Sequence, residues 1–252
     1  MLRLTDKYPQ LSRPPLREAL VDIKLQNVLS AEWVKSLEQN GFEGFDSSQP
    51  IKESGFKFEL PHVDKPAHAV VISDQTSGRR YDRNDGTRVL QVRRDGMTLS
   101  ILKNYTNWEA LKDAAHALWG RFLQISGPVH VGRLAVRYIN AIEMIPGDDY
   151  DKYLTAAPRI ADGLPQIVNN FIQRVEIPFL NEEAIAIITQ TLGGPASDSS
   201  GKFSAIIDID VFCWCSLEGT SDDVWLRLDN LRDIANRVFF SSITKRVLES
   251  YL

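Results

Sequence analysis

The chain has 252 residues, of which 43% are hydrophobic and 25% charged, and its formal net charge is −4. These values are ordinary for a globular protein and leave room for one large domain or two halves. A mildly acidic chain has no overall electrostatic attraction for nucleic acid or anionic lipid, and no apolar run reaches the roughly 20 residues that span a bilayer. We therefore expect neither nucleic acid nor a membrane as a partner.

The first half of the chain predicts a strand, a helix, several antiparallel strands and a long helix. Apolar and polar residues alternate over 18–25, which is typical of a strand with one polar face. Ser30 is a suitable N-cap for a helix over 31–40, and Thr106 with Glu109 forms the capping box of a helix that ends at Gly127-Pro128. Between the helices we predict strands at 56–60, 68–73, 88–94 and 97–103, a polar loop or irregular hairpin at 74–87, and a tight turn at Asp95-Gly96.

The second half follows a similar order with a longer first strand. Residues 131–145 alternate as one long strand, and residues 165–175 predict a short helix. A long helix starts near Ser221, and a short terminal helix follows a break at Ser241-Ser242. Two further strands are predicted at 183–193 and 203–215.

Hairpin signals between strands indicate an antiparallel sheet, and the apolar stripe of each long helix must cover one of its faces. We therefore predict an α+β fold in which a curved antiparallel sheet carries long helices packed on one side. The element order resembles a TATA-binding-protein-like or helix-grip-like duplication, with halves at 1–127 and 128–252 that form one compact unit sharing a sheet. The core is expected to hold Trp33, Trp108, Trp119, Trp214 and Trp225.

Charged side chains gather on one face of the predicted sheet. Arg133 and Arg137 share the polar face of the long strand, and Asp208 and Asp210 share that of a later strand. Three interpretations follow: a solvated surface of cross-strand ion pairs, a concave pocket whose arginines bind an anionic group, and a catalytic pair of carboxylates about 7 Å apart. The same face is expected to carry Glu18, Asp22, Lys24 and Arg93, so its charges balance, unlike those of a DNA-binding saddle.

Asn140 interrupts the apolar face of the long strand. A buried carboxamide must be hydrogen-bonded, and it can satisfy backbone groups where a strand bends or bulges. We interpret Asn140 as marking such a bend, and a ligand contact is the alternative. The candidate ligand-binding residues are therefore Arg133, Arg137, Asn140, Asp208 and Asp210.

The sequence carries no catalytic constellation, metal-ligand spacing or cofactor motif that we recognise. Cys213 and Cys215 lie two apart on one face of a strand, a poor geometry for a disulfide. We expect small buried thiols in a reducing compartment, and hence a cytoplasmic protein with neither a metal nor another cofactor. The N-terminal stretch has no continuous apolar core, so we expect no signal peptide. Catalytic residues stay unknown, and whether the protein is an enzyme stays open.

The C-terminal segment, residues 239–252, is rich in apolar side chains. An apolar terminus is not left free in water, so it packs either on its own sheet or on a second copy of the chain. The second possibility is a homodimer formed through this segment.

Several segments resemble a sporadically distributed bacterial protein family of unknown function: PPLREALVDIKL, NWEALKDAAHALWGRF, GRLAVRYINAIEM, PFLNEEAIAIITQ and LDNLRDIANRVFFSSITKRVLE. The resemblance extends over nearly the whole chain and implies a bacterial cytoplasmic protein, but no activity, cofactor or catalytic residue. We expect a non-enzymatic binding or regulatory module for a protein partner or small ligand. The alternative is an enzyme or ligand-binding protein that uses the polar face of the sheet.

Overall fold

The computed structural model describes residues 8–59, 68–145, 147–193 and 203–252, without the side chains of 54–59 and 68–74. It is an α+β fold built on one nine-stranded antiparallel sheet that is not closed into a barrel. The strands are β1 (Leu16–Leu25), β2 (Ser47–Glu59), β3 (His68–Asp82), β4 (Arg88–Arg93), β5 (Gly96–Ile101), β6 (His130–Met144), β7 (Ile172–Phe179), β8 (Ala184–Gly193) and β9 (Phe203–Glu218). The helices are α1 (Ala31–Gln39), α2 (Trp108–Ser126), α3 (Asp223–Ser242) and α4 (Lys245–Tyr251), with the 3-10 helices η2 (Tyr150–Lys152) and η3 (Leu180–Glu182).

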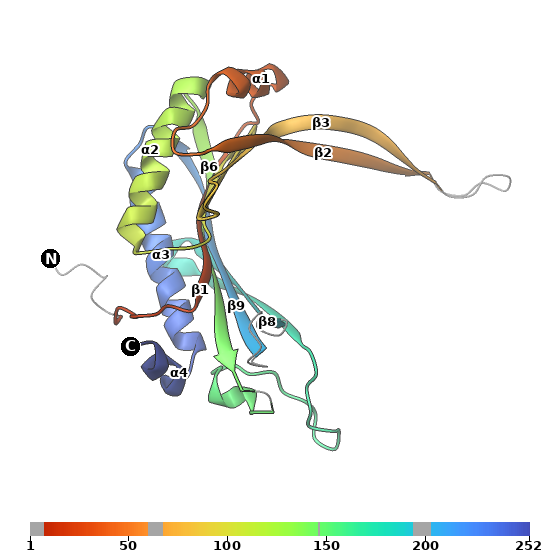
Figure 1. Cartoon of the computed structure of the whole chain (residues 1–252), viewed down its shortest axis with the longest axis vertical. Coiled ribbons are helices and arrows are strands. Elements are labelled where there is room, and N and C mark those ends of the chain that lie inside the picture. The colour runs from red at the N-terminus through yellow and green to blue at the C-terminus, as the bar shows by residue number, and fades with distance from the viewer. Residues whose placement is uncertain (1–7, 60–67, 146, 194–202) are drawn as a thin grey trace.

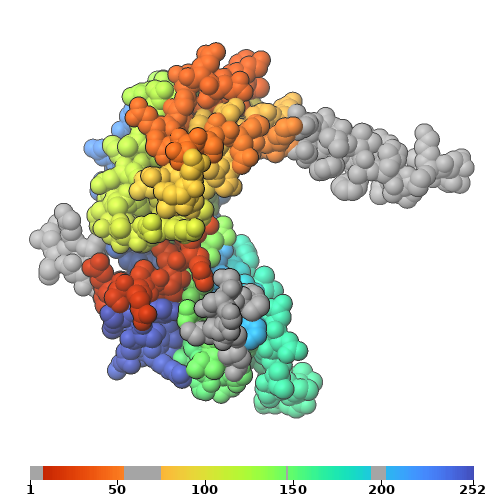
Figure 2. Space-filling model, viewed as in Figure 1, coloured from red at the N-terminus to blue at the C-terminus, as the bar shows by residue number. Residues whose placement is uncertain are grey.

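The strands lie in the order β2-β3-β4-β5-β1-β6-β9-β8-β7, so β1 and β6 form the centre and β2 and β7 the edges. The long helices α2 and α3 pack on one face of the sheet, and the opposite face carries no helix within the described residues (Figure 1). The sheet is strongly curved, and its uncovered side is hollowed between the β2–β3 ribbon and the lower half of the molecule (Figure 2). The predicted curved antiparallel sheet with helices on one side is confirmed.

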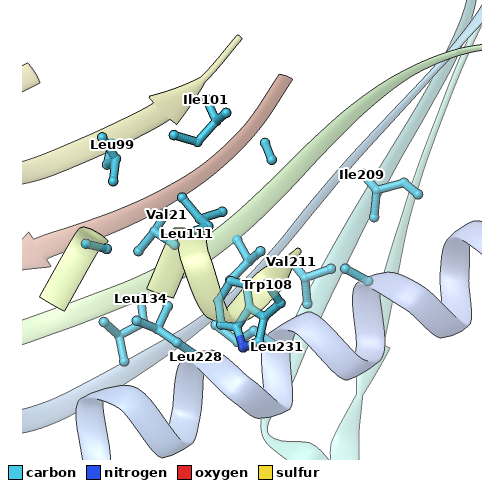
Figure 3. Close-up of a cluster of buried hydrophobic side chains, with 14 of the residues drawn as sticks. Val21, Leu99, Ile101, Trp108, Leu111, Leu134, Ile209, Val211, Leu228 and Leu231 are labelled. Carbon is cyan, nitrogen blue, oxygen red and sulfur yellow. The ribbon is translucent and has the colours of Figure 1, made fainter. Parts of the chain in front are cut away.

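One face of each central strand supplies the core, as the two-residue period of a strand requires. Val21 of β1, Leu134 of β6 and Ile209 of β9 face the helices and belong to one buried cluster with Leu111 of α2 and Leu231 of α3 (Figure 3). All five side chains are at most 2% exposed. Burying one such side chain contributes about 1.5–3 kcal/mol, so this layer is the main source of stability.

Two tryptophans tie the long helices into this core. The Trp119 indole donates a hydrogen bond to the Gly219 carbonyl at 2.7 Å, and the Trp108 indole donates to the Asp229 carboxylate of α3 at 2.6 Å. Both side chains are 2% exposed, which confirms their predicted core position. The prediction is wrong for Trp214, which lies on the uncovered face of the sheet and is 69% exposed.

Pairing between strands corrects two local predictions. For 74–87 the polar loop is wrong and the hairpin alternative is confirmed, since β3 continues to Asp82 and pairs with β4, and the Tyr81 hydroxyl donates to the Leu37 carbonyl at 3.3 Å. Residues 165–175 form no helix, because their last part belongs to β7 and pairs with β8. A polar composition or a helical spacing of apolar residues decides little where a neighbouring strand supplies backbone partners.

The N-cap of α2 lies one residue beyond the predicted position, and the predicted hairpin turn lies where it was expected. The N-cap of α2 is Asn107, whose side chain accepts a hydrogen bond from the first helical turn at 2.8 Å, so the predicted Thr106 capping box is wrong. The hairpin at Asp95-Gly96 is confirmed, with Gly96 already in β5 and opposite Arg93 of β4.

The C-terminal segment packs on its own chain. Ile243 and Val247 are each 4% exposed, Ile243 forms a backbone bridge with Leu154, and the Ser12 amide donates to the Tyr251 carbonyl at 2.8 Å. The break predicted at the end of α3 is confirmed, while a contact between two copies through this segment stays a prediction. Among the described residues, no helix has the length and apolar character needed to cross a membrane.

Substitution of Gly96 tests the close contact between β1 and β5. Gly96 has a φ of +142°, and a Cβ there would lie 2.0 Å from the carbonyl oxygen of Ile23. We expect Gly96→Ala to lower the free energy of unfolding by at least about 2 kcal/mol, because alanine brings both backbone strain and a clash. Urea unfolding followed by circular dichroism measures this change.

Gly120→Ala is the matched control for that measurement. Gly120 lies on the exposed side of α2, and a Cβ there would meet nothing within 4 Å. Alanine should therefore raise the free energy of unfolding by about 0.5–1 kcal/mol through its helix propensity. Equal stabilities of the Gly96 variant and the wild type would contradict the strand contact described above.

Candidate functional site

The uncovered face of the sheet brings together four of the five predicted ligand-binding residues. The register of β6 and β9 places Arg137 directly opposite Asp210 and Arg133 opposite Trp214. Arg137 forms a bidentate pair with Asp208, with Nε–Oδ1 and Nη2–Oδ2 distances of 2.7 and 2.5 Å. This hydrogen-bonded pair raises the pKa of Arg137, which keeps the guanidinium charged.

Asp22 of β1 lies at the centre of the same cluster and is only 8% exposed. Thr98 of β5 donates its hydroxyl to one carboxylate oxygen at 2.5 Å, and Arg133 of β6 donates to the other at 3.1 Å. Arg93 of β4 donates to the Thr98 hydroxyl at 2.9 Å and lies 3.8 Å from the Asp22 carboxylate. One buried carboxylate therefore links four neighbouring strands.

Arg133 extends the cluster into the second half of the sheet. Its Nη2 lies 3.6 Å from an oxygen of Asp210, and its guanidinium stacks over the Phe212 ring at 4.4 Å. Burial raises the pKa of the Asp210 carboxyl, although Arg133 and Arg137 act in the opposite direction. Desolvation of Asp210 is therefore the stronger effect at this position.

This geometry favours the ion-paired surface among the three predicted interpretations. Arg133 and Arg137 already pair with aspartates of the described chain, so an anionic ligand would have to displace a carboxylate to reach them. Asp208 is held by Arg137 in the same way. The carboxylates serve as partners of arginines here, which is the ordinary structural role of such residues on a sheet.

Asn140 lies on the helix-covered face, so it does not join the other four predicted residues. Strand β1 bulges opposite it, because Leu16 pairs with Asn140 while Glu18 pairs with the next residue back, Ile139. Asn140 is 5% exposed, and its amide donates to the Ile207 carbonyl of β9 at 3.3 Å. The irregularity lies in β1, whereas β6 pairs regularly with β9 through Asn140, so the bend predicted for the long strand stays a prediction.

Asn140 also lines a cavity of about 400 Å³ on the helix side of the sheet. The walls come from β6, the start of α2, the second half of α3 and the residues that precede β1. Cavities of this size accommodate small organic molecules. Six aromatic residues line it: Tyr8, Tyr105, Trp108, Tyr138, Phe239 and Phe240. Its polar lining residues include Thr106, Asn107, Glu109, Asn140, Arg232 and Asn236.

Tyr138 brings an unsatisfied polar atom to this cavity. Its hydroxyl oxygen is buried, and no group among the described residues meets it in good hydrogen-bonding geometry. The Tyr105 hydroxyl interacts with it electrostatically, and the two rings meet edge-on at a centroid distance of 6.2 Å. Burial raises the pKa of Tyr138 well above its ordinary value, so the hydroxyl keeps its proton and can donate it in a hydrogen bond. An unpaired buried hydroxyl costs about 1–3 kcal/mol, which an acceptor atom of a ligand would remove.

A second hollow of about 630 Å³ lies between the end of β6 and α4. Its lining includes Arg13, Arg17 and Arg246, which are exposed, and none of the buried unpartnered polar atoms of the described residues belongs to it. The Asn140 cavity is therefore the better-built of the two, although it is smaller.

The two cysteines are free thiols on the helix-facing side of β9. Contact with Cys215 lowers the pKa of Cys213 to about 7, and the same contact raises that of Cys215. Cys213 is only 2% exposed, which keeps this thiol away from solvent reagents. Within the described ranges, no group of three or more histidine, cysteine, aspartate or glutamate side chains is placed to hold a metal ion.

Comparisons of the chain with protein-family models, with curated proteins and with solved structures found no match. Membership of the bacterial family that the sequence resembles therefore stays a prediction. The function has to be inferred from the chemistry of the two faces of the sheet.

Replacing Asp22 tests the importance of the central carboxylate. Asp22→Asn keeps the size of the side chain but removes the charge that pairs with Arg133 and Arg93. We expect the free energy of unfolding to fall by at least about 2 kcal/mol, because a mostly buried guanidinium loses its partner. The control is Asp151→Asn, whose pair with Arg159 is exposed and should contribute no more than about 0.5 kcal/mol. Equal effects of the two substitutions in urea unfolding would contradict a buried cluster.

Asp210→Asn tests the desolvation of the second carboxyl. Because burial raises the folded-state pKa of Asp210 above its ordinary value of 3.8, the folded protein holds this proton more tightly than the unfolded chain. The contribution of Asp210 to stability therefore falls as pH rises through that raised pKa. In urea unfolding measured from acid to neutral pH, the free energy of unfolding of the variant should therefore rise relative to that of the wild type over this interval. Parallel pH curves of the two proteins would contradict the raised pKa.

Proposed function

We propose that the chain is a non-enzymatic binding module that holds a small molecule in the cavity beside Asn140. The observation that carries this proposal is the buried hydroxyl of Tyr138, which no group of the described residues meets in good hydrogen-bonding geometry, in the wall of a cavity of about 400 Å³. Folded proteins rarely leave such a group unsatisfied without a reason. This proposal includes the predicted alternative that Asn140 contacts a ligand, and it places that contact on the helix side of the sheet.

The chemistry of the cavity favours a neutral aromatic ligand with polar groups. Its aromatic walls provide stacking and edge-on contacts for a flat ring. The charged lining residues Arg232 and Glu109 have opposite signs, so the cavity as a whole does not select a charged molecule. Asn140 and Tyr138 supply hydrogen-bonding groups that would orient the ring. Nucleosides, phenols and indoles belong to this class.

The uncovered face centred on Arg133, Arg137, Asp208 and Asp210 is the alternative binding or catalytic site. Its ion pairs argue against a small anion as the ligand, because each arginine already has a carboxylate partner. The exposed Trp214 and the balanced charge suit a protein surface better. We therefore rank a protein partner on this face below the small ligand in the cavity.

We also propose a bacterial cytoplasmic protein whose two halves arose by duplication. The free thiols support a reducing compartment. The strand order supports a duplication, because β5, β4 and β3 follow β1 on one side as β9, β8 and β7 follow β6 on the other. A TATA-binding-protein-like or helix-grip-like origin would produce such an order.

Thermal unfolding in the presence of nucleosides, phenols and indoles tests the proposed function. A compound present at a hundred times its dissociation constant stabilises the folded state by about 2.7 kcal/mol, which corresponds to a rise in Tm of about 5–10 °C. Asn236→Phe should abolish this rise, because Asn236 lines the cavity and a phenyl ring would occupy it.

Asn230→Phe is the matched control, since Asn230 lies on the exposed side of the same helix and should leave the rise in Tm unchanged. The absence of any stabilising compound would overturn the proposal. A rise that persists in the Asn236 variant would place the binding site elsewhere.

A further inference from the structure

Among the residues that the structure describes, strand β7 leaves one edge of the sheet open. It pairs with β8 on one side and is the last strand of the sheet on the other, beside β8 in Figure 1. Its apolar residues Ile172, Val175 and Ile177 are 77%, 41% and 37% exposed. An open edge presents unpaired N–H and C=O groups that can bind another strand.

The two charges of β7 have opposite signs and stand on the same face of the strand. Arg174 and Glu176 are two residues apart and exposed, and neither has an ion-pair partner among the described residues. Val175 lies between them on the other face. This arrangement is self-complementary, because reversing the strand exchanges the two charges about Val175.

We propose that β7 joins two copies of this chain, with the two β7 strands antiparallel around a two-fold axis at Val175. Each Arg174 then lies opposite Glu176 of the second copy, and Ile172 opposite Pro178 of the second copy. Two ion pairs and a Val175–Val175 contact result from one isologous interface. Opposite charges on facing residues of neighbouring strands stabilise antiparallel pairing.

The charges also specify the register. Moving the axis by one residue toward the C-terminus places Glu176 opposite its own counterpart in the second copy, and moving it the other way does the same for Arg174. Like charges directly opposite each other destabilise a sheet. The register centred on Val175 is therefore favoured over both neighbours.

Pro178 indicates which backbone groups face outward. Proline has no N–H and is tolerated in an edge strand where its nitrogen points away from the existing ladder. Pro178 pairs with Ile185 of β8, so its nitrogen faces the open side by this rule. Backbone groups alternate along a strand, and hence the N–H and C=O groups of Arg174 and Glu176 face the open side as well. The residues that form the ion pairs thus also form the central hydrogen bonds.

The competing interpretation is that these residues block pairing. Charged side chains and proline on an edge strand also protect proteins against aggregation. That interpretation predicts a monomer of 28.5 kDa at every concentration. The two interpretations also differ in the expected effect of charge reversal. A charge that only prevents strand pairing does so whether it is positive or negative.

Sedimentation velocity of the full chain over a wide concentration range tests the proposal. We expect the wild type to reach twice the 28.5 kDa mass as its concentration rises. Arg174→Glu and Glu176→Arg should each raise the dissociation constant about tenfold or more, because both place like charges opposite each other twice per dimer. The double variant R174E/E176R should restore the wild-type dissociation constant.

An equimolar mixture of the two single variants should also dimerise, because one carries two acidic and the other two basic side chains in β7. Dimerisation of the mixture would show that the single variants are folded and have lost only the charge pairing between two identical copies. Arg159→Glu is the control, since Arg159 is an exposed arginine outside β7 and its reversal should leave the dimer intact. A wild type that stays monomeric, or a dimer that both single variants retain, would overturn the proposal. The second outcome would direct the search to a truncation of residues 241–252.

Discussion

The helices of the described fold all lie on one face of the sheet, so the other face of nine strands must be stable in water without cover. Antiparallel sheets meet this condition by alternating apolar and polar side chains along each strand. Here the central strands add a buried carboxylate, Asp22, that accepts hydrogen bonds from Thr98 and Arg133. A slip of one residue in any of these strands would turn the charges into the core. The polar cluster therefore selects the register of the central strands, whatever its net contribution to stability.

The same alternation explains why Asn140 is separated from the arginines. From Leu134 to Met144 of β6, residues with even numbers face the helices and those with odd numbers lie on the uncovered face, so Asn140 and Arg137 belong to different environments although they are three residues apart. The bulge in β1 opposite Asn140 interrupts the regular sheet at the point where the cavity opens. A buried hydroxyl without a well-placed partner is costly, and the cavity of about 400 Å³ beside it gives an acceptor atom access to that group. Binding of a ligand would offset that cost, which a structural role alone does not explain.

Much of the fold could be predicted from the sequence, because its signals are local. The alternation in β6 and the N-cap Ser30, whose hydroxyl accepts from the Trp33 amide at 3.2 Å, are both read within a few residues. The segment 165–175 was beyond such reasoning, since its strand exists only through pairing with β8. The cavity was also beyond it. Tyr138 precedes Asn140 by two residues on the same face, and this was its only sequence signal, whereas Arg232 reaches the cavity from a helix about ninety residues away.

Pairing through β7 would join the uncovered faces of two copies into one surface. Five strand spacings would then separate the two β9 strands, which is about 24 Å. The exposed Trp214 and the ion-paired cluster of each copy would lie on that common face, where a protein partner could contact both. The cavity would be unaffected, because no residue of β7 lines it. The proposed dimerisation and the proposed small-molecule binding would therefore use separate residues, and the loss of one in a variant would leave the other available for measurement.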